Sequence, residues 1–228
     1  MRALAQELSV QGNVIVATST KMYVPNWCPV VLTSAPGTLT AAAVRAKAAA
    51  REFAGDQITQ ARAMLDEVAQ ALRENSVVCV GSNHEPTGKL QASNLELSQL
   101  ASLADFVLVE ADGAKTLPLK AHAAYEPVIP ACTMRTVCVA GIDGIGKPVS
   151  QACHRPEIFA RLAGVSVNTV VNPEIVANVL NAEGFGDILL VNKVESEKDQ
   201  RLAQRIAALV NMPVVAGSLQ KGEFQCLR

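Results

Sequence analysis

Short apolar runs alternate with longer segments of helical periodicity along most of this chain. Six of the runs are four or five residues long and rich in Val, Ile and Leu. Runs that are apolar throughout are typical of strands buried on both faces of a parallel sheet. We therefore expect strands at 14–17, 77–80, 106–109, 136–140, 188–191 and 213–216.

Helical patterns lie between these runs. Apolar residues recur on one helix face in 57–74, and 38–53 contains neither Gly nor Pro. Asn172 and Ser196 are candidate N-caps, each followed by an acidic first turn. We expect helices at 38–53, 57–74, 94–103, 172–181 and 199–210.

Strands separated by helices imply right-handed crossovers and an open sheet. We therefore predict an α/β fold with a mostly parallel sheet and helices on both faces, a three-layer, P-loop NTPase-like arrangement. The 228 residues suffice for a single domain with its own core. Glycine turns and a short helix in 141–164 predict a small excursion from the sheet.

Composition narrows the class of protein. The formal charge of -1 argues against nucleic-acid binding, which usually requires a basic excess. No apolar run approaches the roughly 20 residues that cross a bilayer, and Gln6 and Glu7 interrupt any signal-peptide core. The six cysteines form no C-x-x-C pair, so neither a disulfide framework nor a zinc finger is expected. The sequence predicts a soluble cytoplasmic protein.

Ligands of open α/β sheets bind beyond the carboxyl ends of the strands, so the residues after each run are candidate site residues. Glu110 directly follows the third run, and Asp112 comes two positions later on the same side. P-loop NTPases hold Mg²⁺ with an acid at such a position, and Gly113 lets a phosphate approach the backbone. We predict Glu110 and Asp112 as catalytic and metal-binding residues; the alternative is a solvated Asp-Gly turn.

Hydroxyl groups and a cation follow the first run. Thr18, Thr20 and Lys21 offer ligands for Mg²⁺ and a counter-charge for phosphate. An ST-turn followed by an exposed lysine explains the same residues equally well.

The loop after the fifth run resembles the N-K-x-D sequence with which GTPases recognise guanine. Asn192, Lys193 and Glu195 occupy its three positions. Glu in the last position keeps the acceptor but lengthens the side chain, so a base-binding loop and an ordinary loop before a capped helix remain equal alternatives.

A complete phosphate loop is not found. Residues 141–147 fit G-x-x-x-x-G-K, but Pro148 replaces the Ser or Thr that Mg²⁺ requires. Residues 1–18 read as a helix that runs into a strand, as the helix after a phosphate loop does. We therefore expect the first strand and P-loop of the fold to precede Met1. Without them an open sheet edge would favour a homodimer or an unstable chain.

Several motifs together resemble the YqeC family. They are TSTKM, VLVEADGAKTLPLKAH, YEPVIP, AGIDGIGKP, CHRPE and LLVNKVE, and they span most of the chain. The family is described as bacterial accessory proteins for selenium-dependent molybdenum hydroxylases. It is similar to P-loop NTPases of the metallocentre-maturation kind, whose E-x-x-G motif matches Glu110 to Gly113.

The resemblance implies a maturation protein that binds Mg²⁺ with GTP or ATP in its full-length form. Its partners would be a molybdenum hydroxylase client or the molybdenum cofactor. The alternatives are a non-hydrolysing binder of a molybdopterin-type cofactor or client, and a transferase acting on a small substrate. The resemblance also implies a loop region that meets the cofactor or client, formed by Lys115, Lys120, His122, Glu126, His154 and Arg155.

Overall fold

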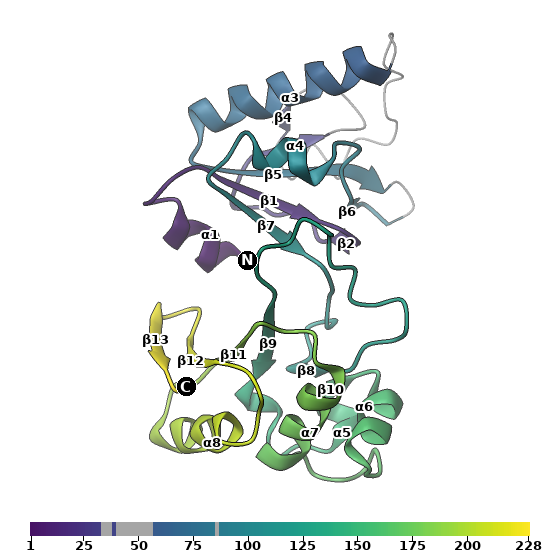
Figure 1. Cartoon of the computed structure of the whole chain (residues 1–228), viewed down its shortest axis with the longest axis vertical. Coiled ribbons are helices and arrows are strands. Elements are labelled where there is room, and N and C mark those ends of the chain that lie inside the picture. The colour runs from purple at the N-terminus through teal and green to yellow at the C-terminus, as the bar shows by residue number, and fades with distance from the viewer. Residues whose placement is uncertain (33–37, 40–56, 85–86) are drawn as a thin grey trace. The chain divides into compact units, whose positions relative to one another are not determined.

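The computed structural model describes residues 1–32, 38–39, 57–84 and 87–228. It divides the chain into two compact units (Figure 1). Unit 1 comprises 1–113 and 128–132, and unit 2 comprises 114–127 and 133–228. The single domain with an excursion at 141–164 stays a prediction. The segments where the chain passes from one unit to the other contain no Gly- or Ser-rich run, so nothing in the composition marks the boundary.

Unit 1 is built on a seven-stranded sheet. Four of its strands are parallel and contain the longest apolar runs: β3 (Val30–Leu32), β5 (Val77–His84), β1 (Val14–Thr18) and β7 (Phe106–Glu110). Three short strands pair antiparallel: β2 (Lys21–Met22), β4 (Thr38–Leu39) and β6 (Lys89–Gln91).

Helices cover both faces of this sheet (Figure 1). Ala5 of α1 (Arg2–Leu8) packs with Val14 and Val16 of β1. The intervening β1 residues, Ile15 and Ala17, face α3 (Gln57–Glu74) and α4 (Leu97–Ala101). Burial on both faces explains why β1 reads as a continuous apolar run, since neither face is left for polar residues.

Unit 2 has its own sheet and a small two-stranded pair. β9 (Val137–Gly141), β11 (Ile188–Asn192) and β12 (Val214–Ser218) are parallel, and β13 (Glu223–Cys226) pairs antiparallel with β12. β8 (Leu119–Lys120) pairs in parallel with β10 (Cys153–His154). The helices are η1 (Ile142–Gly144), α5 (Val149–Ala152), α6 (Pro156–Ala163), α7 (Pro173–Glu183) and α8 (Glu197–Ala207).

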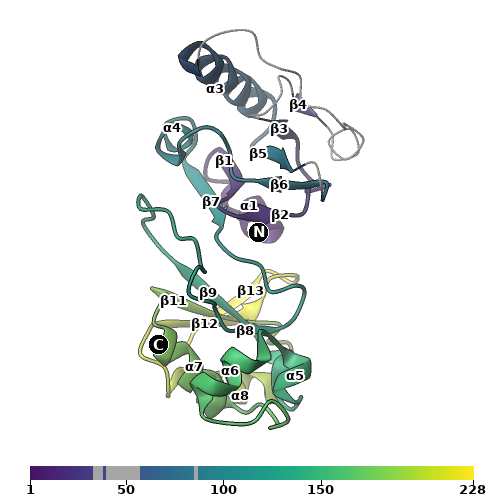
Figure 2. The ribbon, with the colours of Figure 1, turned by 90° about the vertical axis from the view of Figure 1, so that its right-hand side faces the viewer.

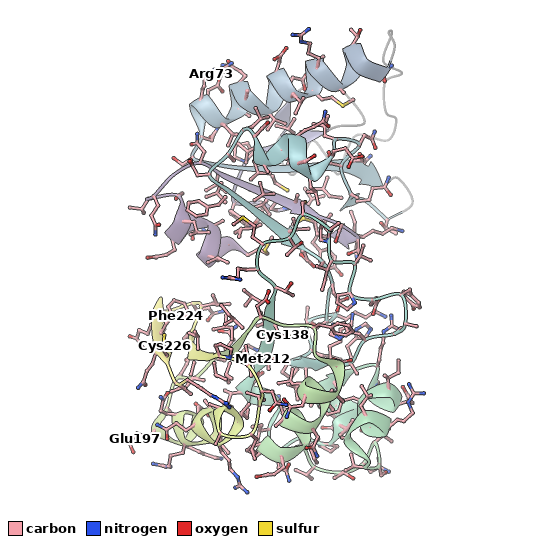
Figure 3. The ribbon with its side chains drawn as sticks, viewed as in Figure 1. Arg73, Cys138, Glu197, Met212, Phe224 and Cys226 are labelled. Carbon is pink, nitrogen blue, oxygen red and sulfur yellow. The ribbon has the colours of Figure 1, made fainter. Side chains whose placement is uncertain are left out.

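The helices of unit 2 gather on one side of its sheet (Figure 2). Leu189 and Val191 of β11 belong to one hydrophobic core with the apolar residues of α6, α7 and α8. Val137 and Val139 of β9 are 48% and 56% exposed. Phe224 and Cys226 lie on the exposed strand β13 (Figure 3). The prediction of helices on both faces therefore describes unit 1 and not unit 2.

All six predicted strands are confirmed. The helix predicted at 57–74 is confirmed as α3. Asn172 and Ser196 both act as N-caps, accepting hydrogen bonds from Ile175 N at 2.9 Å and from Asp199 N at 3.2 Å. The helix predicted at 94–103 shortens to α4. Of the helix predicted at 38–53, the first two residues form β4 instead, and 40–53 lie outside the described residues.

The prediction of mostly parallel sheets was wrong, because the sheets are mixed. The antiparallel strands have two to four residues, too few to give a recognisable apolar run. β6 turns back along β5 after Gly88, whose φ of 62° places it in the left-handed region that glycine adopts readily. No helix in the described part of the chain is long and apolar enough to cross a membrane.

Candidate functional site

The carboxyl ends of β1 and β7 lie side by side in unit 1. The parallel register pairs Thr18 with Glu110. Thr18 Oγ1 donates to the Glu110 carbonyl at 2.9 Å and accepts from Thr20 N at 3.1 Å, while Ser19 N donates to the same carbonyl at 3.3 Å. These bonds join the two strand ends, which the sequence predicted at the same edge of a sheet. The Thr18 side chain is buried and holds this edge together.

Glu110 lies partly buried at this edge. Burial raises the pKa of its carboxyl group above the usual value. The N-terminal amino group lowers this pKa, the Asp112 carboxylate raises it further, and the Lys89 ammonium group lowers it. Lys89 belongs to β6, and its Nζ sits 4.2 Å above the centre of the Tyr23 ring. The Asp112 carboxylate thus disfavours the charged form of Glu110, and a positive charge beside the pair would favour it.

The remaining residues predicted at this edge are in unit 1 as well. Gly113 follows Asp112, and a Cβ placed on it would lie 3.4 Å from Glu110 Oε1. Lys21 begins β2 and is exposed. Among the described residues no group of three or more His, Cys, Asp or Glu could hold a metal ion by itself. The donor set of two carboxylates fits Mg²⁺, which usually keeps several waters and takes further ligands from a substrate phosphate.

The loop predicted to face a base lies in unit 2, after β11. Asn192 Oδ1 accepts from Leu219 N at 3.0 Å. Glu195 accepts from Ser218 Oγ at 2.8 Å and pairs with Lys221 Nζ at 3.2 Å. The hydrogen bond from Ser218 and the one from Lys221 lower the pKa of Glu195. Asn192 and Glu195 therefore connect the loops after β11 and β12.

Lys193 reaches a different acid. Its backbone has a φ of 64°, and its Nζ donates to Asp143 Oδ2 at 2.9 Å. Asp143 lies in η1, within the stretch that imitates a phosphate loop, and also pairs with Lys147 at 3.9 Å. Two cations therefore meet one carboxylate here, within a stretch that forms the short helix η1 ahead of Pro148.

The sequence predicted one sheet edge that gathers every candidate nucleotide-binding residue, and this prediction was wrong. Thr18, Thr20, Lys21, Glu110, Asp112 and Gly113 are in unit 1, and Asn192, Lys193 and Glu195 are in unit 2. The strands that carry them pair in separate sheets. Apolar runs identify strands but carry no information about which strands are neighbours, so the two edges could not be separated by pattern.

A third group of predicted residues does come together, around Glu126 in unit 2. Glu126 Oε2 lies 3.0 Å from Lys120 Nζ and accepts from Arg155 Nε at 3.0 Å. Glu126 Oε1 accepts from Arg155 Nη2 at 2.7 Å, and the same Nη2 donates to the Tyr125 hydroxyl at 3.1 Å. We call Lys115, Lys120, Glu126, His154 and Arg155 the Glu126 cluster.

His154 belongs to this cluster because β10 pairs with β8 in a register that places His154 opposite Lys120. Burial lowers the pKa of His154, and so do the positive charges of Lys120, Lys115 and Arg155, with Glu126 opposing them. Its Nδ1 atom is buried and has no hydrogen-bond partner within the described residues.

His122 has a partner outside the cluster. Its backbone N donates to Glu183 Oε1 at 2.7 Å, and its Nδ1 lies 2.9 Å from Glu183 Oε2. The ring also meets Phe185 edge-on, with centroids 5.3 Å apart. Glu183 is the last residue of α7, so one carboxylate joins this helix to the loop after β8.

Sequence reasoning missed several partners of the predicted residues. Lys89, Glu183, Tyr125, Asp143 and Lys221 each contact or electrostatically influence one of them. Most of these pairings have no local sequence signal, because they depend on tertiary placement. Tyr125 alone had a local signal, since it immediately precedes Glu126 in the YEPVIP motif.

Comparisons with known proteins identify relatives by sequence only. The family model described as YqeC protein matches residues 1–157. A protein of Escherichia coli (strain K12) named "Uncharacterized protein YqeC" is 34% identical over 82 residues, which is 35% of this chain and 32% of that relative. The match thus spans about a third of the relative's length. No solved structure matches significantly.

Proposed function

Because the chain belongs to the YqeC family, we propose that it is an accessory protein for a selenium-dependent molybdenum hydroxylase and binds a Mg²⁺-nucleotide at the carboxyl edge of β1 and β7. The family resemblance supports the accessory role. The arrangement of this edge supports nucleotide binding. GTP and ATP both suit the proposal, since the residues at this edge would contact phosphate and metal and not the base.

One observation carries the nucleotide proposal: the register of β1 and β7 places the hydroxyl-rich end of one strand beside the carboxylate end of the other. Ligands of parallel sheets bind at this edge because loops there can vary without disturbing the core. Glu110, partly withdrawn from water, is suited to a cation that restores its charged form.

We assign a different role in nucleotide binding to each residue of this edge. Glu110 and Asp112 would hold Mg²⁺, which supplies positive charge against the phosphate oxygens. Lys21, exposed on β2, would neutralise a phosphate oxygen, and Thr20 would donate a hydroxyl hydrogen bond. Thr18 positions the others by tying the two strand ends together.

Isothermal titration of the chain with Mg²⁺-ATP and Mg²⁺-GTP tests the proposal. We expect saturable binding that requires Mg²⁺ and weakens at least tenfold in the double variant Glu110→Gln, Asp112→Asn, because both metal ligands lose their charge. Asp66→Asn, which removes an exposed acid of α3, is the matched control and should bind as the wild type does. Equal affinity in the double variant and the control would contradict the proposal, as would no binding of either nucleotide.

A second candidate function is non-hydrolysing binding of a molybdopterin-type cofactor or of the client enzyme. The observation that favours it is the Glu126 cluster, which unites in unit 2 five of the six residues expected to meet a cofactor or client. Recovery of a pterin or of a hydroxylase subunit with the Glu110→Gln, Asp112→Asn variant would support this function over nucleotide binding.

A further inference from the structure

His154 lies in a positive electrostatic environment. The register of β10 and β8 places Lys120 opposite His154, and the charges of Lys120, Lys115 and Arg155 each lower the pKa of its imidazole by more than Glu126 raises it. These residues come from three segments: the turn around residue 115, the strand β8, and β10 with the residue that follows it. A positive environment assembled from three segments can receive an anion there.

Two of these cations have N–H groups that could bind a further anion. Arg155 donates from Nε to Glu126 and from Nη2 to Glu126 and Tyr125. Its Nη1 group donates no hydrogen bond within the described residues. Lys115 is exposed, and its ammonium group makes no ion pair in the described part of the chain. An incoming anion could therefore be bound without breaking the contacts of Glu126.

The backbone holds these residues in an uncommon conformation. The non-glycine residues with positive φ among those described are Lys115, Thr116, Arg155 and Lys193, so three of the four belong to this region. Left-handed backbone is unfavourable for a residue with a side chain, and such residues concentrate at binding sites. At Arg155, which caps α6, the conformation accompanies a guanidinium directed to Glu126.

We propose that Lys115, His154 and Arg155 form a binding site for a phosphate group, either free phosphate or a phosphate monoester. The inference rests on the second candidate function, whose surface it specifies, and it requires no nucleotide in unit 1. Lys120 contributes charge from within the cluster.

Phosphate fits these donors better than a carboxylate does. Arg155 already binds one carboxylate with two parallel hydrogen bonds, and the donors that remain belong to three side chains on different segments. A tetrahedral dianion presents several acceptor oxygens and can meet donors that arrive from different directions. Its two negative charges also match the excess of cations over acids around His154.

The site is tested by following the His154 C2–H signal in proton spectra of the full chain as pH is varied, with and without inorganic phosphate. Bound phosphate should raise the pKa of His154, because a dianion counteracts the three cations that lower it. Lys115→Gln should weaken phosphate binding roughly tenfold by removing a charged donor. Lys198→Gln, an exposed lysine of α8, is the matched control and should have no effect.

A parallel titration with methyl phosphate separates the two sources of the group. Tighter binding of methyl phosphate identifies a monoester as the ligand, and tighter binding of inorganic phosphate identifies the free ion. The Glu110→Gln, Asp112→Asn variant should bind phosphate at His154 normally, so failure of nucleotide binding and failure of this site give different results. A His154 titration that neither probe shifts, or an equal response of Lys115→Gln and Lys198→Gln, would overturn the inference.

Discussion

Replacing Glu126 by Gln should lower the free energy of unfolding by about 3 kcal/mol, the cost of removing one partner from a buried ion pair. Lys120 and Arg155 would lose the carboxylate that both contact, and the Lys120 side chain is only 7% exposed. The buried Lys120 ammonium group could not be hydrated in place once its partner is removed. The amide of Gln has nearly the same shape, so the loss would come from charge and not from packing.

Urea unfolding followed by circular dichroism measures this loss. Glu197→Gln provides the matched control, because Glu197 (Figure 3) is 94% exposed and pairs with Arg201 at 3.5 Å on the surface of α8. Exposed pairs of this kind contribute under about 1 kcal/mol. Adding Lys120→Met to the Glu126→Gln variant should recover part of the stability. A Glu126→Gln variant as stable as Glu197→Gln would contradict the structure of the cluster.

Replacing Phe159 by Ala should cost about 4 kcal/mol. Phe159 lies in α6, is 2% exposed and is among the largest fully buried side chains. It packs in the core that also contains Leu189 and Val191. In the chain, Phe159 comes four positions after Arg155. Truncation would leave a cavity beneath the helix that follows the proposed phosphate site, so the arrangement of Arg155 depends on this packing.

Phe224→Ala is the control for this truncation. Phe224 (Figure 3) is 50% exposed on β13, so removing its ring should cost less than about 1.5 kcal/mol. Hydrogen exchange measured on both variants should show lost protection across α6 and α7 for Phe159→Ala and little change for Phe224→Ala. Similar losses in the two variants would contradict the core of unit 2 as described.

The parts of the fold that the sequence predicted are those with a strong local signal. β1 has four successive buried apolar residues before Thr18, and α3 keeps one apolar face over its whole length. Asn172 and Ser196 were identifiable as caps because a side-chain oxygen three residues before a backbone N–H is a local arrangement. Strands β2, β4 and β6 had no such signal, since each has only two or three residues and is held by pairing with another strand.

The residues of the candidate site also differ in how far the sequence could predict their positions. Glu110 and Thr18 were predicted at one sheet edge because parallel strands end there, and their register brings them together. Asn192, Lys193 and Glu195 were assigned to that edge by the same reasoning, which assumed one sheet; they belong to the sheet of unit 2. Glu183 and Asp143 were missed because their roles as partners of His122 and Lys193 depend on contacts across 61 and 50 positions of sequence.

Binding of a metal-nucleotide at the carboxyl edge of β1 and β7 is tested most directly by paramagnetic broadening. Mn²⁺, which prefers the same oxygen ligands as Mg²⁺, would be added with ATP or GTP to the ¹⁵N-labelled chain. The signals of residues 18–21 and 110–113 should broaden selectively in the wild type and stay sharp in Glu110→Gln, Asp112→Asn. Broadening centred on residues 192–195, or none that depends on the nucleotide, would contradict the proposed site.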